Sequence, residues 1–457
     1  MKACAILLLL LFTGILRAQD FTRFYQDTAD VQVAMHLLKD SSGSFWMGGY
    51  KSAVEENSRA WIYRLNSEGE VLRKIGFPGT EAHVWGGMIS QGNEIFTVIG
   101  LQDFFGSTRY YLAGIAGDSL QSWRYLPALD NAALHDSRPG ADRRLLISGF
   151  RGSEGIAGND FFLARINTET AETDWVYYEG FGPNDHISTC RELPDGSVLF
   201  CGTVADQGNY NPCMGKLDTA GQLIWLNVLS TIWNDGSQKF EVAENGDIWL
   251  VGESSTSAGS LFDTELFRLN SEGQLLWQQW LGSPGQDAAF HIQRKENQPG
   301  FWVAGYSNAG QNGSGPISPF LMSLDYEGNS LGEVFWPMNS PSPVYDAVIF
   351  SDSVFYLCGT SAGSAFLLKR KQPEFSPVFT VSVQEKDRGE EDRLSTLKLE
   401  LAAGRIRDPE VYNVFGQRIG ASQEIASGQL NDGRVYFIRW KACNGERKFL
   451  RICWEGR

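Results

Sequence analysis

An acidic side chain recurs along this sequence about every fifty residues, and it is the first feature that could support chemistry. The set is Asp30, Glu81, Asp130, Asp185, Asp235, Asp287 and Asp346. Carboxylate oxygens are preferred ligands of calcium, so such residues, brought together, could hold a divalent cation. The same side chains could instead cap their own turns by accepting backbone N–H hydrogen bonds. Repetition in every unit favours capping, because a binding site normally uses a few units unequally. Calcium is the one cofactor that the sequence suggests.

The histidines form a second group of candidate functional residues. All five follow one of these acids within six residues, namely His36, His83, His135, His186 and His291. Their distances from the acids differ in parity, and successive side chains of a strand point to opposite faces, so they cannot all face one way. We expect most of them to pack within strands. A metal-binding or general-base role for one or two is the alternative.

Two cysteines flank the segment "RELPDGSVLF", in which residues 194–197 form a hairpin turn. Pairing Leu193 with Val198 would place Cys190 opposite Cys201, so a cross-strand disulfide is feasible. The favoured alternative is that both are small residues buried between packed sheets. No CxxC pair or His–Cys cluster indicates zinc.

Known catalytic motifs are absent from the sequence. It contains no GxSxG nucleophile elbow, HExxH zinc motif or phosphate-binding loop. Paired carboxylates for glycoside cleavage cannot be assigned among so many Asp residues. We therefore assign no catalytic residue, and we consider an enzyme the less favoured interpretation.

The elements that must position these residues are short strands in a repeated unit. A hydrophobic strand ends in glycine at Gly49, Gly100, Gly149, Gly202, Gly252, Gly305 and Gly359, in steps of 49 to 54 residues. Each unit reads as four short strands, and the fourth often carries tryptophan, as at Trp123, Trp175, Trp225 and Trp277. Four strands repeated seven times predict a seven-bladed β-propeller.

The ends of the predicted propeller provide a check on this architecture. The seventh unit has no convincing fourth strand before Pro373, whereas residues 21–25 resemble an outer strand that leads into the first unit. We expect this N-terminal strand to complete the last blade within a propeller of residues 19–378. Such closure removes exposed strand edges, which otherwise invite aggregation.

The unit "GSPGQDAAFHIQ…GFWVAGYSN…FLMSLDYEGN" resembles the glycine-rich propeller repeats of exported proteins from Bacteroidota. The similarity spans most of the chain and supports the fold. It indicates no activity.

The first 18 residues are predicted to be a signal peptide. Lys2 precedes a short apolar run, and Ala18 provides a small residue at the expected cleavage point. A membrane anchor is the alternative, but a run of about fourteen residues is short for spanning a bilayer. After removal of the signal peptide we expect no transmembrane segment.

A second unit follows the propeller. Residues 379–393 are densely charged and are predicted to be a linker, and residues 394–457 show a new alternating pattern that predicts a small antiparallel β-sandwich. This tail resembles the type A-like C-terminal sorting domain of the type IX secretion system. The residues that carry the resemblance are Val411, Tyr412, Asn413, Gly416, Gln417, Gly433, Tyr436 and Lys448. The usual Asn-Pro near the start of the domain is missing, and "CWEGR" extends past the usual end.

The charge distribution limits the classes of partner. Residues 384–457 hold 14 Lys and Arg against 12 Asp and Glu, and residues 1–383 hold the other 25 and 42. An acidic main body argues against nucleic acid or an anionic membrane as the partner. With the resemblances, it predicts a secreted or surface-attached monomer that recognises an extracellular glycan or protein and uses the type IX secretion machinery. The alternatives are a polysaccharide hydrolase or lyase centred on the channel, and a structural part of a surface layer.

Overall fold

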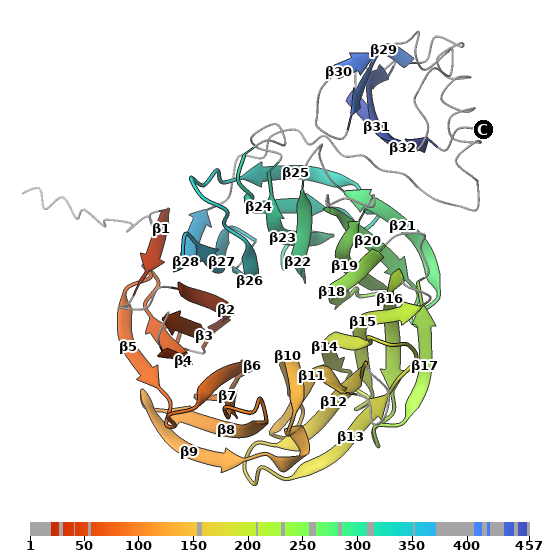
Figure 1. Cartoon of the computed structure of the whole chain (residues 1–457). Helices are drawn as coiled ribbons and strands as arrows, with labels where there is room; N and C mark the ends of the chain where they lie inside the picture. Colours follow the sequence, from red (N-terminus) through yellow and green to blue (C-terminus); the bar gives the residue numbers. More distant parts are fainter. Residues whose placement is uncertain are drawn as a thin grey trace, which may run out of the picture.

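The computed structural model consists of strands arranged around a central axis (Figure 1). It describes residues 20–26, 31–40, 42–53, 56–152, 158–206, 209–229, 234–255, 262–281, 286–308, 315–350 and 352–371, and the backbone of four tail strands within 406–454. Seven four-stranded antiparallel sheets surround the axis. Six are ordered from the inside outward along the sequence, and the seventh takes its outermost strand from the N-terminus. The all-β, seven-bladed prediction is therefore confirmed.

Each blade contributes one strand to each of four concentric layers. The inner strands are β2 (Val31–Lys39), β6 (Ala82–Gln91), β10 (Ala132–Gly140), β14 (His186–Glu192), β18 (Asn234–Val242), β22 (Asp287–Arg294) and β26 (Val344–Phe350). The second strands are β3 (Phe45–Ala53), β7 (Glu94–Gln102), β11 (Arg144–Gly152), β15 (Val198–Asp206), β19 (Ile248–Ser255), β23 (Phe301–Ser307) and β27 (Val354–Ser361). We call the face at which the inner strands begin the start face.

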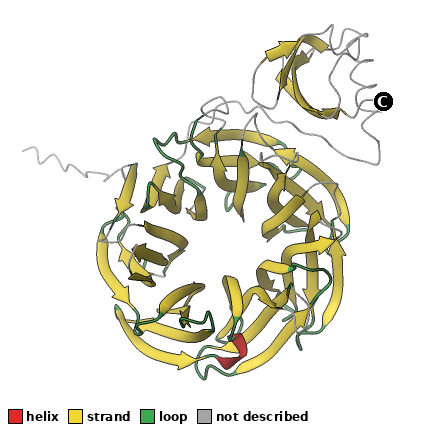
Figure 2. Ribbon diagram, in the orientation of Figure 1, coloured by secondary structure: helices red, strands yellow, loops and turns green. Residues whose placement is uncertain are grey.

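The two remaining layers lie further from the axis. The third strands are β4 (Glu56–Leu65), β8 (Thr108–Ala116), β12 (Asn159–Asn167), β16 (Asn209–Leu217), β20 (Phe262–Leu269), β24 (Ser318–Leu324) and β28 (Ser364–Lys371). The outer strands are β5 (Val71–Gly76), β9 (Ser119–Tyr125), β13 (Thr173–Glu179), β17 (Leu223–Val228), β21 (Leu275–Leu281), β25 (Ser330–Phe335) and β1 (Phe21–Tyr25). The one helical element in the described part of the chain is the 3-10 turn η1 (Pro127–Leu129), which is drawn red in Figure 2.

The N-terminal strand closes the ring. β1 pairs antiparallel with β28, from Phe21 opposite Lys369 to Tyr25 opposite Ala365, so the predicted closure is confirmed. Side chains add to this pairing, because Tyr25 donates a 2.6 Å hydrogen bond from its hydroxyl to the Gly69 carbonyl of the first blade. The last blade is thus completed by backbone pairing with β1 and joined to the first blade through the Tyr25 side chain.

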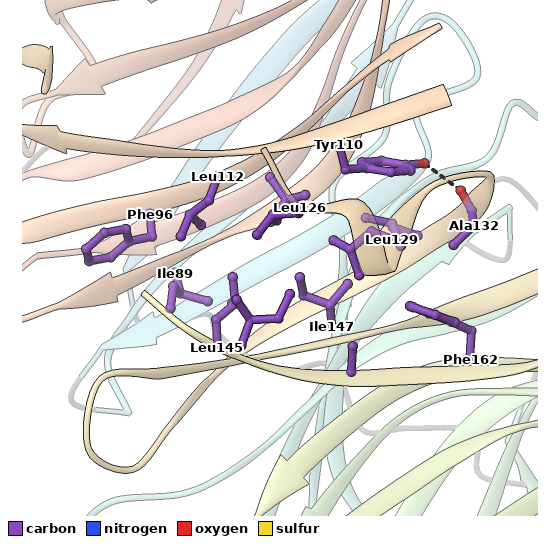
Figure 3. Close-up of a cluster of buried hydrophobic side chains, with 14 residues drawn as sticks. Ile89, Phe96, Tyr110, Leu112, Leu126, Leu129, Ala132, Leu145, Ile147 and Phe162 are labelled. Carbon is purple, nitrogen blue, oxygen red and sulfur yellow. Dashed lines mark hydrogen bonds between the residues drawn. The ribbon is translucent and has the colours of Figure 1, made fainter. Parts of the chain in front are cut away.

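The hydrophobic core lies between neighbouring blades. Figure 3 shows one such cluster, in which Ile89 and Phe96 of the second blade meet Leu145 and Ile147 of the third. These side chains are almost completely buried, and burial of each contributes about 1.5–3 kcal/mol to folding. Seven clusters of this kind explain why the sequence of each unit must match that of the next.

The repeated turn and tryptophan of the sequence form one such contact. The turn glycine Gly273 has φ +76°, and a Cβ built on it would lie 2.4 Å from Cζ3 of Trp225 on the preceding outer strand. Gly221 meets Trp175, and Gly328 meets Trp277, in the same way. At Gly69 the ring is that of Phe21, so the "SEG", "TAG" and "YEG" turns recur because each receives an aromatic ring of the preceding blade.

The repeated strand-ending glycines have a different cause. Every inner strand carries a β-bulge, and in six blades it brings a backbone carbonyl against one of these glycines. A Cβ on Gly305 would lie 1.9 Å from the Ala288 carbonyl oxygen, which no side chain tolerates. At Gly100 of the second blade the nearest atoms belong to side chains instead. Glycine at this position is therefore required by the bulge.

In the tail, β29 (Ile406–Asn413), β30 (Arg418–Gly420), β31 (Arg434–Ala442) and β32 (Arg447–Trp454) form an antiparallel sheet in the order β30-β29-β31-β32. The sandwich, the linker and the signal peptide lie largely or wholly outside the described residues and stay predictions. No helix among the described residues is both long and apolar enough to cross a membrane.

Candidate functional site

The inner-strand bulges determine which side chains reach the axis. In β2, Ala34 pairs with Gly49 and His36 with Gly48, so Met35 is the extra residue. β10, β14, β18, β22 and β26 show the same shift, and β-bulges re-aim side chains in this way. The residues that follow the bulge are His36, Asp136, Thr189, Lys239, His291 and Asp346, which we call the axial ring.

Asp136 occupies the centre of the axial ring. Lys239 Nζ lies 2.6 Å from its Oδ2 atom, and Thr189 Oγ1 donates to the same oxygen at 2.5 Å. His36 Nε2 lies 3.3 Å from Oδ1, and Arg138 Nε donates to Oδ2 at 2.8 Å. Since these partners come from the first, third, fourth and fifth blades, Asp136 must reach close to the axis.

The charges of the ring largely compensate one another. Burial alone would raise the pKa of Asp136, but Arg138 and Lys239 hold it well below its usual range. Burial acts in the same direction on Asp346, yet the hydrogen bond with His291 and the nearby Lys239 lower its pKa to about 2. Asp346 Oδ2 also accepts a 3.0 Å hydrogen bond from the backbone N–H of Leu37, which joins the seventh blade to the first.

The second blade departs from this pattern. Its bulge contains Gly86 and Gly87, so it adds no polar side chain to the ring. Trp85 instead donates from Nε1 to His36 Nδ1 at 2.8 Å. In the neutral imidazole this leaves the proton on Nε2, from which it is directed at Asp136.

The ring is therefore a floor across the axis, with its polar groups directed at one another. Asp136 is 2 % exposed and accepts from several donors, so it is not available as a general base or metal ligand. Exposed groups lie closer to the start face.

A second set of axial residues, the start-face collar, lies between this floor and the start face. It consists of bulged residues of the inner strands, of residues that directly follow the strand-ending glycines on the second strands, and of His186. Its members are Met35, Tyr50, His135, Phe150, His186, Gln238, Glu253, Phe290, Tyr306 and Tyr345, all of them at least partly exposed. The types differ from blade to blade, unlike the residues between blades.

Aromatic rings of the collar contact one another across blades. Phe290 stacks on Tyr306 with centroids 5.4 Å apart and meets Tyr345 of the next blade edge-on at 6.5 Å. On the third and fourth blades, His135 lies 5.1 Å from His186 and 5.4 Å from Phe150. Because these rings brace one another, they present a preformed surface.

Burial disfavours the charged forms of the titratable groups of the collar. Burial lowers the pKa of His186 to about 4, with His135 adding to the effect. Burial raises the pKa of Glu253, which a hydrogen bond with Gln238 partly offsets. Burial and the nearby Glu253 raise the pKa of Tyr306. The collar is therefore suited to an uncharged ligand with polar groups.

Most of the blade-start acids do not reach the axis. Asp185 caps its turn by accepting from the N–H groups of Phe181 and Gly182 at 2.6 and 2.7 Å, and from Ala205 at 3.0 Å. Glu81 accepts from the N–H of Thr80 at 2.9 Å, and Asp130 accepts from the Tyr125 hydroxyl. Asp235 and Asp287 are buried at the starts of β18 and β22.

One assignment among these acids is corrected by the structure. Asp346 lies after the bulge of β26, in the axial ring, and Ser342 takes the equivalent blade-start position. The sequence was misleading because this blade has a serine, not an acid, at the blade-start position. Asp30 lies outside the described residues. Among the residues described, no three His, Cys, Asp or Glu side chains are grouped to hold a metal ion.

The five histidines lie at the inner strands, as expected from the sequence. His36 and His291 belong to the ring, and His135 and His186 to the collar. His83 is buried, and its Nδ1 accepts a 3.2 Å hydrogen bond from the backbone N–H of Ala60.

The proposed cysteine pairing is also corrected. Cys201 pairs with Thr189, and Cys190 pairs with Phe200, so the register differs by one residue from the expected one. A shift of one residue moves a side chain to the other face of a sheet. Cys190 accordingly packs in the cluster with Phe161, and Cys201 in the cluster with Phe240. Both are free buried thiols, as the alternative interpretation held.

Some of the tail residues fall on described strands. Val411, Tyr412 and Asn413 end β29, Tyr436 lies on β31 opposite Asn413, and Lys448 lies on β32. Gly416, Gln417 and Gly433 lie outside the described residues. Their role in sorting stays a prediction.

Comparisons with known proteins support the fold alone. No protein-family model and no curated protein matches the chain. Among solved structures, a catalytically inactive virginiamycin B lyase from Staphylococcus aureus, with quinupristin, is similar at a TM-score of 0.50 and 12% identity, covering 77% of this chain and 99% of that one. An α-L-arabinofuranosidase from Fusarium graminearum is similar at a TM-score of 0.44 and 9% identity, covering 78% and 98%. These neighbours differ in function.

Apart from His135 and His186, the sequence did not single out the collar, nor did it single out Lys239, although a signal for the ring was present. Asp136 precedes Gly149 by thirteen residues, and Thr189 precedes Gly202 by the same interval. Aligning the units on their glycines would have shown a column of polar residues that differ from blade to blade.

Proposed function

We propose that this protein binds a neutral glycan at the start-face collar. The observation that carries the proposal is the convergence of partly exposed aromatic and uncharged polar side chains around one axis, beside a compensated floor. Ligand sites combine an apolar surface with a few well-placed polar groups, and the collar has both. The strand-ending glycine recurs in all seven blades, but the collar residues vary, as a specific site requires.

The chemistry of the collar suits a sugar. Phe290 and Tyr345 offer aromatic surface to the apolar C–H side of a pyranose ring. Gln238 and the carboxyl group of Glu253 supply donors and acceptors for hydroxyl groups.

The charge of the start face argues for a neutral sugar over an anionic one. Carboxylates lie there at Glu81, Asp160 and Glu179, each at least partly exposed. They would repel uronate or sulfated polysaccharides, particularly at low salt.

We further propose that the protein is exported and that it binds its glycan outside the cell. The N-terminal signal sequence and the resemblance of the tail to a type IX sorting domain favour secretion or attachment at the outer surface. A protein bound there through its tail would act as an adhesion module for glycans. Deletion of residues 394–457 should trap the protein in the periplasm, and unchanged export would reject this part of the proposal.

A glycan array on the mature chain, residues 19–457, tests the binding proposal. The variant Tyr345→Ala should lose at least ~10-fold in affinity for the glycan that the wild type binds, since it removes an aromatic contact. Leu72→Ala is the control, because Leu72 is a 54 % exposed side chain near the beginning of the outer strand β5, away from the start face. Equal binding by both variants would contradict the collar as the site.

Polysaccharide cleavage is the second candidate function, favoured by one observation. Glu253 has a raised pKa and lies beside Tyr306 in the collar, as a general acid could. Reducing-end release from the glycan that binds best would support cleavage if Glu253→Gln abolished it while binding persisted. Binding without any release would leave the adhesion function alone.

A further inference from the structure

Two phenylalanines of the second blade are exposed to an unusual degree. Phe104 and Phe105 are 97 % and 90 % exposed, whereas every other large apolar side chain described is less than 60 % exposed. Their rings meet edge-to-face with centroids 5.7 Å apart. Keeping two phenyl rings in water has a cost in free energy, so their position needs an explanation.

The turn that carries them is well defined by hydrogen bonds. Asp103 Oδ1 accepts from the N–H groups of Phe105 and Ser107 at 2.9 and 3.0 Å. The backbone adds a bond from Asp103 N–H to the Ser107 carbonyl at 2.9 Å, and one from Gly106 N–H to the Asp103 carbonyl at 3.1 Å. The rings are therefore displayed on a fixed turn, which limits the entropy lost when a ligand binds.

This turn lies on the start face, like the collar. It connects β7 to β8, and its neighbour Gln102 pairs with Ala82, the first residue of the inner strand. The same blade is the one whose bulge consists of Gly86 and Gly87 and adds no side chain to the collar. A bulge without side chains and an exposed aromatic pair thus occur on a single blade.

The size and charge of the surroundings limit what could cover the two rings. They offer on the order of 300–500 Å² of surface, which is well below the area buried in a stable protein complex. Carboxylates at Asp103, Glu81 and Asp130 lie on the same face and would repel an anionic lipid surface. The two phenyl rings are therefore suited to add contacts to a ligand that is already bound at another site.

We propose that Phe104 and Phe105 form an outer subsite for the glycan that binds the collar, whose chain leaves the axis over the second blade. This inference rests on the proposed function. The collar would hold the end of the chain, and the two rings would stack on sugars further along it. The protein would accordingly distinguish long glycans from short ones.

Calorimetry with neutral oligosaccharides of the class that the array identifies, from disaccharide to hexasaccharide, tests this proposal. The wild type should bind more tightly as the chain lengthens. The double variant Phe104→Ala/Phe105→Ala should bind the disaccharide normally and lose about 5- to 10-fold in affinity for the hexasaccharide, as expected for aromatic contacts. Leu331→Ala removes a 57 % exposed side chain from an outer strand and should change neither affinity.

Several outcomes would overturn the subsite. Unchanged hexasaccharide affinity, or an equal loss for both ligands, would show that the rings do not extend the site. Loss of phosphatidylcholine-vesicle binding or of dimer formation in the double variant, with sugar affinity unchanged, would assign the rings to a membrane or a second copy. Failure of the proposed function is distinguishable, because then the wild type would bind no oligosaccharide of any length.

Discussion

The positions between the blades and the positions around the axis follow opposite rules. Between blades, one solution recurs, with a turn glycine against an aromatic ring and a strand-ending glycine against a bulge. Around the axis, the position after the bulge in six blades holds His36, Asp136, Thr189, Lys239, His291 and Asp346 in turn. The difference teaches that repetition encodes the fold, whereas departures from repetition mark the site.

This comparison predicts its largest effect at a repeated glycine. Gly305→Ala should lower the free energy of unfolding by about 4 kcal/mol or prevent folding, because its Cβ would overlap the Ala288 carbonyl. Urea unfolding would measure the loss. Gly100→Ala should be tolerated better, since only side chains approach there, and Gly76→Ala, with no atom within 4 Å, is the control. Equal losses at all three positions would contradict the role of the bulge.

The next effect concerns the axial floor. Asp136→Asn should lower the free energy of unfolding by about 2–4 kcal/mol, because Lys239 and Arg138 lose their shared counter-ion. Adding Lys239→Met should recover part of that loss.

The floor also predicts a dependence on pH. The pKa of Asp136 is lowered by folding, so its stabilising effect is present above the unfolded-state pKa of about 4 and is lost as the pH falls. Thermal unfolding of the wild type and Asp136→Asn should therefore converge in acid. A constant difference across pH would show that charge is not the cause.

A smaller effect on stability is expected at Glu333, a residue of an outer strand that lies away from the axis. Burial, together with Asp287, raises the pKa of Glu333 on β25 to about 8. A raised carboxyl pKa gives stability that is present below the unfolded-state pKa and lost as the pH rises through the folded value. Glu333→Gln should thus change little at pH 4 and stabilise the protein by about 1–2 kcal/mol at pH 9. Stabilisation at both pH values would contradict this explanation.

The smallest effect on stability is predicted in the collar. Tyr345 is partly exposed, so Tyr345→Ala should lower the free energy of unfolding by less than about 1 kcal/mol. Its effect on glycan affinity should be much larger. Circular dichroism melts beside binding curves would show the contrast, and a large loss of stability would assign the residue to the core instead.

The sequence predicted the fold well because the fold depends on what repeats. Spaced glycines and tryptophans identified seven blades, and the missing fourth strand of the last blade identified β1 as its partner. The register of a single hairpin was harder to predict. The turn at Leu193–Ser197 closes with a hydrogen bond from the Leu193 N–H to the Ser197 carbonyl. That bond shifts the pairing by one residue and separates Cys190 from Cys201.

The candidate site was largely missed for the same reason. Repeated acids attracted attention, but Asp185 caps a turn and Asp346 belongs to a different position. Residues such as Phe290 and Lys239 have no counterpart in other blades, and a search for repeats gives them no weight. Contacts such as that between His36 and Asp136 join blades that are not adjacent, so only a closed ring reveals them.

Hydrogen exchange with a saturating oligosaccharide tests the central claim most directly. We predict slower exchange in the first halves of β10, β22 and β26, which carry His135, Phe290 and Tyr345, and in the turn at residues 103–107. Exchange in β13, β17 and β21 should not change. Protection confined to those outer strands would show that the ligand binds the rim and that the variable axial residues are not its site.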